Sequence, residues 1–195
     1  GNFHGRTTTI ISFSSSKGSK ENFGPLTPGF EIIDYNNIKQ LEDVLKKDKN
    51  IAGFLVEPIQ GEGGVVVPDD GYLSKAKKLC EKYNVLFIAD EIQTGIGRTG
   101  KLLASWHEDI IPDIVILGKA LSAGFYPVSG VLTSKEIMSV MQVGSHGSTF
   151  GGNPLAGVVA KASIKYTLDY KLSENAENLG KIFRDGLEKI KSRRK

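Results

Sequence analysis

The apolar positions of this chain follow two alternating patterns. Short apolar runs rich in β-branched residues predict strands at 51–58, 85–90, 114–119 and 127–132. Apolar residues at helical spacing predict helices over 37–47, 72–83, 134–141, 153–166 and from about 173 onward. Strands that alternate with helices are typical of a parallel sheet covered by helices on both faces. The pattern therefore predicts an α/β fold with a mainly parallel sheet.

Two helices carry further local signals. Asn153 followed by Pro154 is typical of a helix start, with Asn as the N-cap and Pro at the first helical position. The last helix is expected to bury one apolar face. That face consists of Ala176, Leu179, Ile182, Phe183, Leu187 and Ile190.

Composition excludes several classes of protein. The sequence has 195 residues, 39% hydrophobic and 24% charged, which is ordinary for a globular protein. Its 25 basic and 22 acidic residues leave a net charge of +3, with no clustered basic face, so we expect no nucleic-acid partner. No apolar stretch is long enough to span a membrane. The single cysteine, Cys80, excludes an internal disulfide and lies on the apolar side of the helix predicted at 72–83. The three histidines share no ligand spacing, so no metal site is expected.

Two polar residues follow apolar strands, Asp90 after 85–89 and Lys119 after 114–118. Ligands of open parallel sheets bind outside the carboxyl ends of the strands, so both side chains are expected at one crevice if the two strands are neighbours. A lysine desolvated there has a lowered pKa, and its neutral amine is a nucleophile for Schiff-base formation. An acid beside a pyridine nitrogen would keep that nitrogen protonated. A simple ion pair at a strand end explains Lys119 equally well.

The segment Gly95–Gly100 matches the G-x-G-x-x-G pattern of nicotinamide-dependent oxidoreductases. That fingerprint should open directly from a strand into a helix, yet residues 90–94 intervene, and the next strand ends in Lys119 instead of an acid. We therefore interpret these glycines as a loop with unusual backbone angles. Ala89-Asp90-Glu91 resembles the end of a Walker B strand, but no P-loop sequence occurs in the chain.

Other polar residues have both a functional and an ordinary explanation. Ser148 and Thr149 precede a helix start, where hydroxyls and backbone amides favour a phosphate, although turn and capping chemistry explains them too. Arg6 is suited to a substrate carboxylate, but an isolated arginine is more often in a surface ion pair. Glu57 and Glu62 flank a loop at a third strand end, so they are expected near the same crevice.

Five strings together resemble the class III aminotransferases of the ornithine, acetylornithine and 4-aminobutyrate type. They are GNFHGRT (1–7), EPIQGEGGVVVP (57–68), FIADEIQTGIGRTG (87–100), PDIVILGKALSAGFYPVSGVL (112–132) and GSHGSTFGGNPLA (144–156). They occur in the family's order and cover most of the chain. Within the family, the second and fourth strings are most similar to the ornithine branch, followed by the acetylornithine branch.

The resemblance implies a fold type I large domain that binds pyridoxal 5′-phosphate (PLP). Lys119 would then form the Schiff base with PLP and move the proton between the substrate and the cofactor. Asp90 would pair with the pyridine nitrogen, Gln93 would bond the ring hydroxyl, and Phe3 would stack on the ring.

The resemblance also implies roles outside the ring. Ser148 and Thr149 would reach the cofactor phosphate of a neighbouring subunit, so the sites would be shared across a homodimer. Arg6 would bind a substrate carboxylate. Glu62 would be the acid that neutralises a substrate-binding arginine during one half-reaction. The implied substrates are an amino acid and a 2-oxo acid.

The implied reaction moves the δ-amino group of ornithine to 2-oxoglutarate, giving glutamate semialdehyde and glutamate. The resemblance places the large domain at 1–167 and the start of a C-terminal small domain at 168–195. Family members carry segments on both sides of this region, so the isolated chain is expected to bind PLP weakly and to turn over poorly if at all. No signal or transit peptide is visible. A cytoplasmic location is expected, with the mitochondrial matrix as the alternative. A binding module without activity is the remaining alternative, against which the intact Lys119, Asp90 and Gln93 argue.

Overall fold

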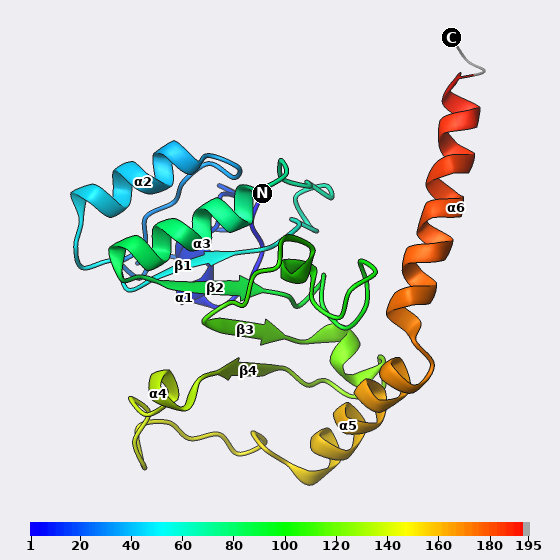
Figure 1. Cartoon of the computed structure of the whole chain (residues 1–195). Coiled ribbons are helices and arrows are strands. Elements are labelled where there is room, and N and C mark those ends of the chain that lie inside the picture. The colour runs from blue at the N-terminus through cyan, green and yellow to red at the C-terminus, as the bar shows by residue number, and fades with distance from the viewer. Residues whose placement is uncertain (193–195) are drawn as a thin grey trace. The chain divides into compact units, whose positions relative to one another are not determined.

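A computed structural model describes residues 1–192, which belong to two compact units. The first unit comprises Gly1–Asp90 and Glu108–Val115, and the second comprises Glu91–His107 and Ile116–Lys195. The strands are β1 (Gly53–Val56), β2 (Leu86–Asp90), β3 (Ile114–Leu117) and β4 (Gly130–Thr133), and they follow one another in this order in the sheet. The arrow of β4 runs against that of β3, so the sheet is mixed (Figure 1). The predicted α/β class with a mainly parallel sheet is confirmed.

In the first unit, β1 and β2 pair in parallel, with Gly53 opposite Leu86 and Val56 opposite Ala89. Its helices are α1 (Thr8–Ser12), α2 (Ile38–Lys47) and α3 (Tyr72–Tyr83). Helices α2 and α3 lie side by side, and α3 packs on β2 (Figure 1). The helices predicted at 37–47 and 72–83 are therefore confirmed.

The core of the first unit is where these helices meet the strands. It comprises Leu41, Leu45, Val56, Tyr72, Leu73, Ala76, Cys80, Val85, Phe87, Ala89 and Ile110. Leu41 and Leu45 come from the predicted apolar face of α2. Cys80 is fully buried, as its place on the helix predicted, and burial raises the pKa of its thiol to about 12.

The second unit contains the helical segments that follow the strands. They are η1 (Ala104–Glu108, whose last residue is assigned to the first unit), η2 (Lys119–Ser122), α4 (Lys135–Met138), α5 (Pro154–Asp169) and α6 (Leu172–Ser192). The Asn153 carboxamide oxygen accepts the Ala156 N–H at 2.9 Å, which confirms the predicted N-cap of α5. The Ser163 hydroxyl donates to the Ala120 carbonyl at 3.1 Å and fastens α5 to η2.

The predicted burial of the apolar face of α6 is wrong. Leu179, Ile182 and Phe183 are all more than half exposed, and none of the described residues of this helix is buried. Periodic apolar residues predict that a helix has an apolar face, but they do not identify the part of the protein that covers it. Across residues 1–192, no helix has both the length and the apolar character needed to cross a membrane.

Candidate active site

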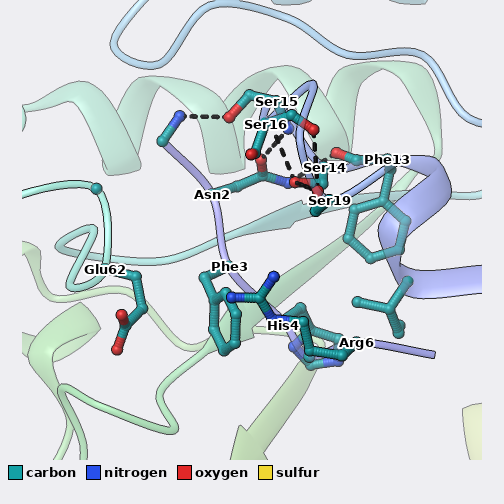
Figure 2. Close-up of a pocket in the computed structure, with 14 residues that line it drawn as sticks. Asn2, Phe3, His4, Arg6, Phe13, Ser14, Ser15, Ser16, Ser19 and Glu62 are labelled. Atoms are coloured by element: carbon teal, nitrogen blue, oxygen red, sulfur yellow. Dashed lines mark hydrogen bonds between the residues drawn. The ribbon is translucent and has the colours of Figure 1, made fainter. Parts of the chain in front are cut away.

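A cavity of about 260 Å³ in the first unit brings together three of the predicted site residues. Phe3, Arg6 and Glu62 line it, together with Phe13 and the serines of the segment 14–19. Figure 2 shows the ring of Phe3 between the carboxylate of Glu62 and the guanidinium group of Arg6. An aromatic face, a cation and an anion are thus presented to one small space.

Bonds on both sides hold the segment 1–4 beside this cavity. The Asn2 amide group donates to the Phe13 carbonyl at 2.8 Å and accepts the Ser15 N–H at 2.9 Å, so it ties the serine-rich wall to the segment. The Phe3 N–H donates to the Glu57 carboxylate at 2.9 Å. The position of the Phe3 ring is therefore set by its backbone as well as by its neighbours.

Arg6 lies over the ring of Phe3, with the guanidinium carbon 5.3 Å from the ring centroid. It is exposed, and no carboxylate of residues 1–192 forms a salt bridge with it. The surface ion pair that was the ordinary explanation of Arg6 is thus absent from the described part of the chain. The N–H donors at the edge of the guanidinium plane are available to an anionic group.

Asp90 is the last residue of β2 and is only 4% exposed. Its carboxylate lies 2.7 Å from the Nδ1 atom of His4, the residue after Phe3. The hydrogen bond to Asp90 raises the pKa of His4 above its usual value, although burial of the ring opposes the shift. A protonated imidazole in this place forms an ion pair with the buried carboxylate.

The His4–Asp90 pair is expected to stabilise the fold more at acidic than at alkaline pH. The folded protein holds the His4 proton more tightly than the unfolded chain does. The contribution is therefore complete below about pH 6.5, the pKa of a free histidine, and is lost as pH rises through the raised pKa. Denaturant unfolding of wild type and His4→Gln should give a stability difference that shrinks as pH rises. His107→Gln, which changes an exposed histidine, is the control, and a pH-independent difference for His4→Gln would contradict the prediction.

Glu57 is a buried carboxylate at the end of β1. Its two oxygens accept the Phe3 N–H at 2.9 Å and the Gly61 N–H at 3.2 Å. Burial raises the pKa of Glu57, while the two backbone hydrogen bonds oppose that shift. Of the two acids expected near one crevice, Glu62 lines the cavity and Glu57 supports the residues around it.

A third buried carboxylate, that of Glu91, organises the loop that follows β2, in the second unit. Glu91 is 1% exposed and accepts hydrogen bonds from the Thr94 hydroxyl, the Ala104 N–H at 3.0 Å and the Ser105 N–H at 2.8 Å. Gln93, predicted to bond the cofactor ring hydroxyl, lies half-buried inside the loop that these bonds close. Neither the role of Glu91 nor that of His4 was predicted from the sequence.

The glycines at 95–100 form turns and do not open a helix. Gly97 and Gly100 adopt φ values of +86° and +101°, as expected for a loop with unusual backbone angles. A Cβ atom at Gly95 would lie 2.7 Å from the Glu91 carbonyl oxygen, so the loop also needs this close approach. The strand-to-helix context of a nicotinamide-binding fingerprint is missing, so the oxidoreductase alternative fails here.

Lys119 is the first residue of η2 and has a φ of +45°, which is uncommon for a residue with a side chain. The prediction of a desolvated lysine is wrong for the described residues, because Lys119 is exposed. The physical reason is that β3 ends at Leu117 and the helical segment η2 begins at Lys119, so Lys119 no longer continues the buried strand.

Ser148 and Thr149 are exposed residues of the second unit. The Ser148 hydroxyl accepts the Gly151 N–H at 2.9 Å, which is ordinary turn chemistry. Their contact with a phosphate stays a prediction. Among residues 1–192, no group of three or more His, Cys, Asp or Glu side chains is arranged to hold a metal ion.

A sequence model of the aminotransferase class-III family matches residues 1–195. The chain belongs to this family. This class-III aminotransferase chain is 56% identical, over 186 residues, to the mitochondrial ornithine aminotransferase of Drosophila melanogaster. The match covers 95% of the chain and 43% of the fly protein, so the chain spans less than half the length of that relative.

Solved structures of the family have the same fold. The class-III aminotransferase chain matches ornithine aminotransferase from Toxoplasma gondii with a TM-score of 0.94 and 54% identity, over 96% of the chain and 44% of that protein. It also matches acetylornithine aminotransferase from Elizabethkingia anophelis with a TM-score of 0.83 and 61% identity, over 86% of the chain and 44% of that protein. Both branches suggested by the five strings are therefore represented among its structural relatives.

Proposed function

We propose that this chain is the cofactor-bearing part of an ornithine aminotransferase, which moves the δ-amino group of ornithine to 2-oxoglutarate. The products would be glutamate semialdehyde and glutamate. The observation that carries the proposal is the cavity lined by Phe3, Arg6 and Glu62, in a chain 56% identical to the fly ornithine aminotransferase. The hydrogen bond between His4, the residue after Phe3, and the buried Asp90 supports it.

The residues of the first unit fit PLP. The ornithine aminotransferase of Toxoplasma gondii has PLP at partial occupancy in its active site. In this chain, a buried carboxylate at a strand end is suited to a protonated pyridine nitrogen, and the Phe3 ring offers an aromatic face at the cavity. When bound, PLP supplies an electron sink for the bonds of the substrate amino carbon.

The remaining roles are assigned to side chains by their chemistry. Lys119 would hold the cofactor covalently through Nζ and carry the proton between donor and cofactor. Gln93 would hydrogen-bond the ring hydroxyl. Arg6 would bind a substrate carboxylate, since its guanidinium has no acidic partner among residues 1–192. Glu62, exposed at the cavity, would neutralise a substrate-binding arginine in one half-reaction.

We also infer a homodimer with shared sites, in which Ser148 and Thr149 reach the cofactor phosphate of the partner. Both residues are exposed, and so are apolar residues near them in the sequence, which suits an interface. These apolar residues are Met138, Val140, Met141, Val143, Phe150 and Leu155. In such a dimer, a defect in one chain can be rescued by a different defect in its partner.

Domain and compartment complete the proposal. Residues 1–167 would belong to the large domain and 168–195 to the start of the small one, a boundary that differs from the two compact units above.

A cytoplasmic location is the primary proposal, and the mitochondrial matrix is the alternative suggested by the mitochondrial fly relative. Fractionation of the source cells with an antibody against this chain would separate the two.

A comparison of amino donors tests the proposed function. The longest natural form of the protein, saturated with PLP and 2-oxoglutarate, should show a kcat/KM for ornithine at least about tenfold above that for acetylornithine or 4-aminobutyrate. The 61% identity to an acetylornithine aminotransferase makes that donor the second candidate. A preference for acetylornithine would move the chain to that branch. No amino transfer from any donor would contradict the aminotransferase proposal and favour a binding module.

A further inference from the structure

The carboxylate of Glu57 joins two segments that both reach the cavity. One of its oxygens accepts the N–H of Phe3, which is 54 positions away in the sequence, and the other accepts the N–H of Gly61. Phe3 lines the cavity itself, and Gly61 precedes Glu62, which lines it from another side. We propose that Glu57 is a positioning residue, which fixes the Phe3 ring and the Glu62 loop relative to each other and so sets the shape of the substrate and cofactor cavity.

The inference rests on the proposed function, since it assigns Phe3 to the cofactor and Glu62 to the substrate side. It assigns to Glu57 no contact with either ligand. The carboxylate is suited to the task because it has two acceptor oxygens and each meets one backbone donor. Hydrogen bonds to an ionised acceptor are the stronger kind, so two of them hold two backbones firmly.

The backbone of Glu57 is itself fixed. The hydroxyl group of Tyr35 lies 3.0 Å from each of the carbonyl oxygens of Glu57 and Pro58, at the point where β1 ends. The ring of Tyr35 packs edge-on against Tyr72, whose centroid is 5.4 Å away and which belongs to the buried core. Tyr35 thus connects the core to the backbone of Glu57, and the Glu57 carboxylate connects that backbone to the two segments that line the cavity.

An alternative is that Glu57 serves folding alone. The charge is costly where it lies, because burial raises the pKa of Glu57 despite the two bonds. A buried charge with such a cost adds little net stability, so a neutral isostere is expected to fold. Glu57→Gln keeps the shape of the side chain but leaves one acceptor oxygen, so one of the two backbone ties must be lost.

The test compares Glu57→Gln with Glu108→Gln in the longest natural form of the protein. Glu108 is the matched control because its carboxylate also accepts a backbone N–H at 2.8 Å, that of Ser74 at the start of α3. Glu108 is the last residue of η1 and does not line the cavity. Hydrogen exchange is measured at the amides of Phe3 and Gly61 without PLP, and at Ala89 as a reference inside β2. The dissociation constant of PLP and the KM of the amino donor are measured in parallel.

For Glu57→Gln we expect exchange at Phe3 or Gly61 to be faster by about tenfold or more, the effect of losing one charge-assisted hydrogen bond. The PLP dissociation constant and the donor KM should each rise by about tenfold, with Ala89 exchange and thermal stability close to wild type. Glu108→Gln should leave PLP binding and KM unchanged.

Three results would overturn the inference. Exchange at Phe3 and Gly61 equal to wild type would show that Glu57 does not hold them. Faster exchange with unaltered PLP binding and KM would show that the ties position nothing of consequence. Loss of the fold in Glu57→Gln would make Glu57 a stability residue. Failure of the proposed function is distinguishable, because wild type itself would then bind no PLP while the exchange result still stood.

Discussion

The Lys119→Ala variant is expected to lose the covalent bond to PLP and nearly all amino transfer. Lys119 is the one residue assigned both to hold the cofactor and to carry the proton, and general acid–base catalysis alone contributes about 10²–10⁴-fold. We expect kcat to fall by at least that factor. After PLP is added and reduced with borohydride, peptide mapping should find label on the Lys119 peptide of wild type and none on that of the variant.

Lys161→Ala is the matched control, since Lys161 is an exposed lysine on α5 in the same unit. It should keep both the label and the rate. Label that persists in Lys119→Ala, or a rate within about tenfold of wild type, would remove Lys119 from its proposed role.

The same variant tests the shared sites of the proposed dimer. Lys119→Ala chains mixed with chains carrying Ser148→Ala and Thr149→Ala should form mixed dimers, in which one site has both its lysine and its phosphate contacts intact. Activity should reappear on mixing two nearly inactive proteins, up to about a quarter of wild type if chains pair at random. No recovery, with mixed dimers shown by mass spectrometry, would mean that each site is built from one chain.

Glu91→Ala is expected to lower the free energy of unfolding by about 3–5 kcal/mol. The carboxylate is 1% exposed and accepts the N–H groups of Ala104 and Ser105 as well as the Thr94 hydroxyl. A methyl group in its place leaves these buried donors without an acceptor, at about 1–3 kcal/mol each. Denaturant unfolding of the longest natural form, followed by circular dichroism, measures the change.

Glu188→Ala is the control for this prediction, because Glu188 is exposed on α6 and its ion pair with Lys191 is long, at 3.6 Å. It should be indistinguishable from wild type. If Glu91→Ala is no less stable than Glu188→Ala, the loop after β2 is not held by this carboxylate.

Thr94→Val, which removes one donor with little change in shape, should lower the free energy of unfolding by about 1 kcal/mol.

Much of the fold follows from local pattern. Leu41 and Leu45 are spaced for one helix face and are buried there. The Asn153-Pro154 pair marks a helix start by short-range bonds alone. The fate of α6 could not be predicted in this way, since burial of Leu179 or Phe183 depends on a partner surface.

The site shows the same limit: local sequence patterns identify some of its residues but not the long-range contacts between them. Asp90 and Lys119 could be singled out because each follows an apolar strand, whereas the burial of Asp90 is known only from the structure. Lys119 is exposed where β3 has ended at Leu117 and η2 begins, and the apolar pattern of 114–119 does not indicate that change. His4 lies between Phe3 and Arg6 in a string already noted, but its bond to Asp90 joins residues 86 positions apart. Long-range hydrogen bonds of this kind leave no periodic signal in one sequence.

The burial of Cys80 makes this residue a natural reporter of how the first unit opens. A thiol reagent needs both access and the thiolate, and Cys80 is fully covered between α3 and the strands with a pKa of about 12. Native molecules are therefore expected not to react with a disulfide reagent at neutral pH. Each labelled molecule then records an event in which α3 has separated from β2. Because the sequence contains no other cysteine, the labelling rate in low denaturant measures how often that helix lifts from the sheet.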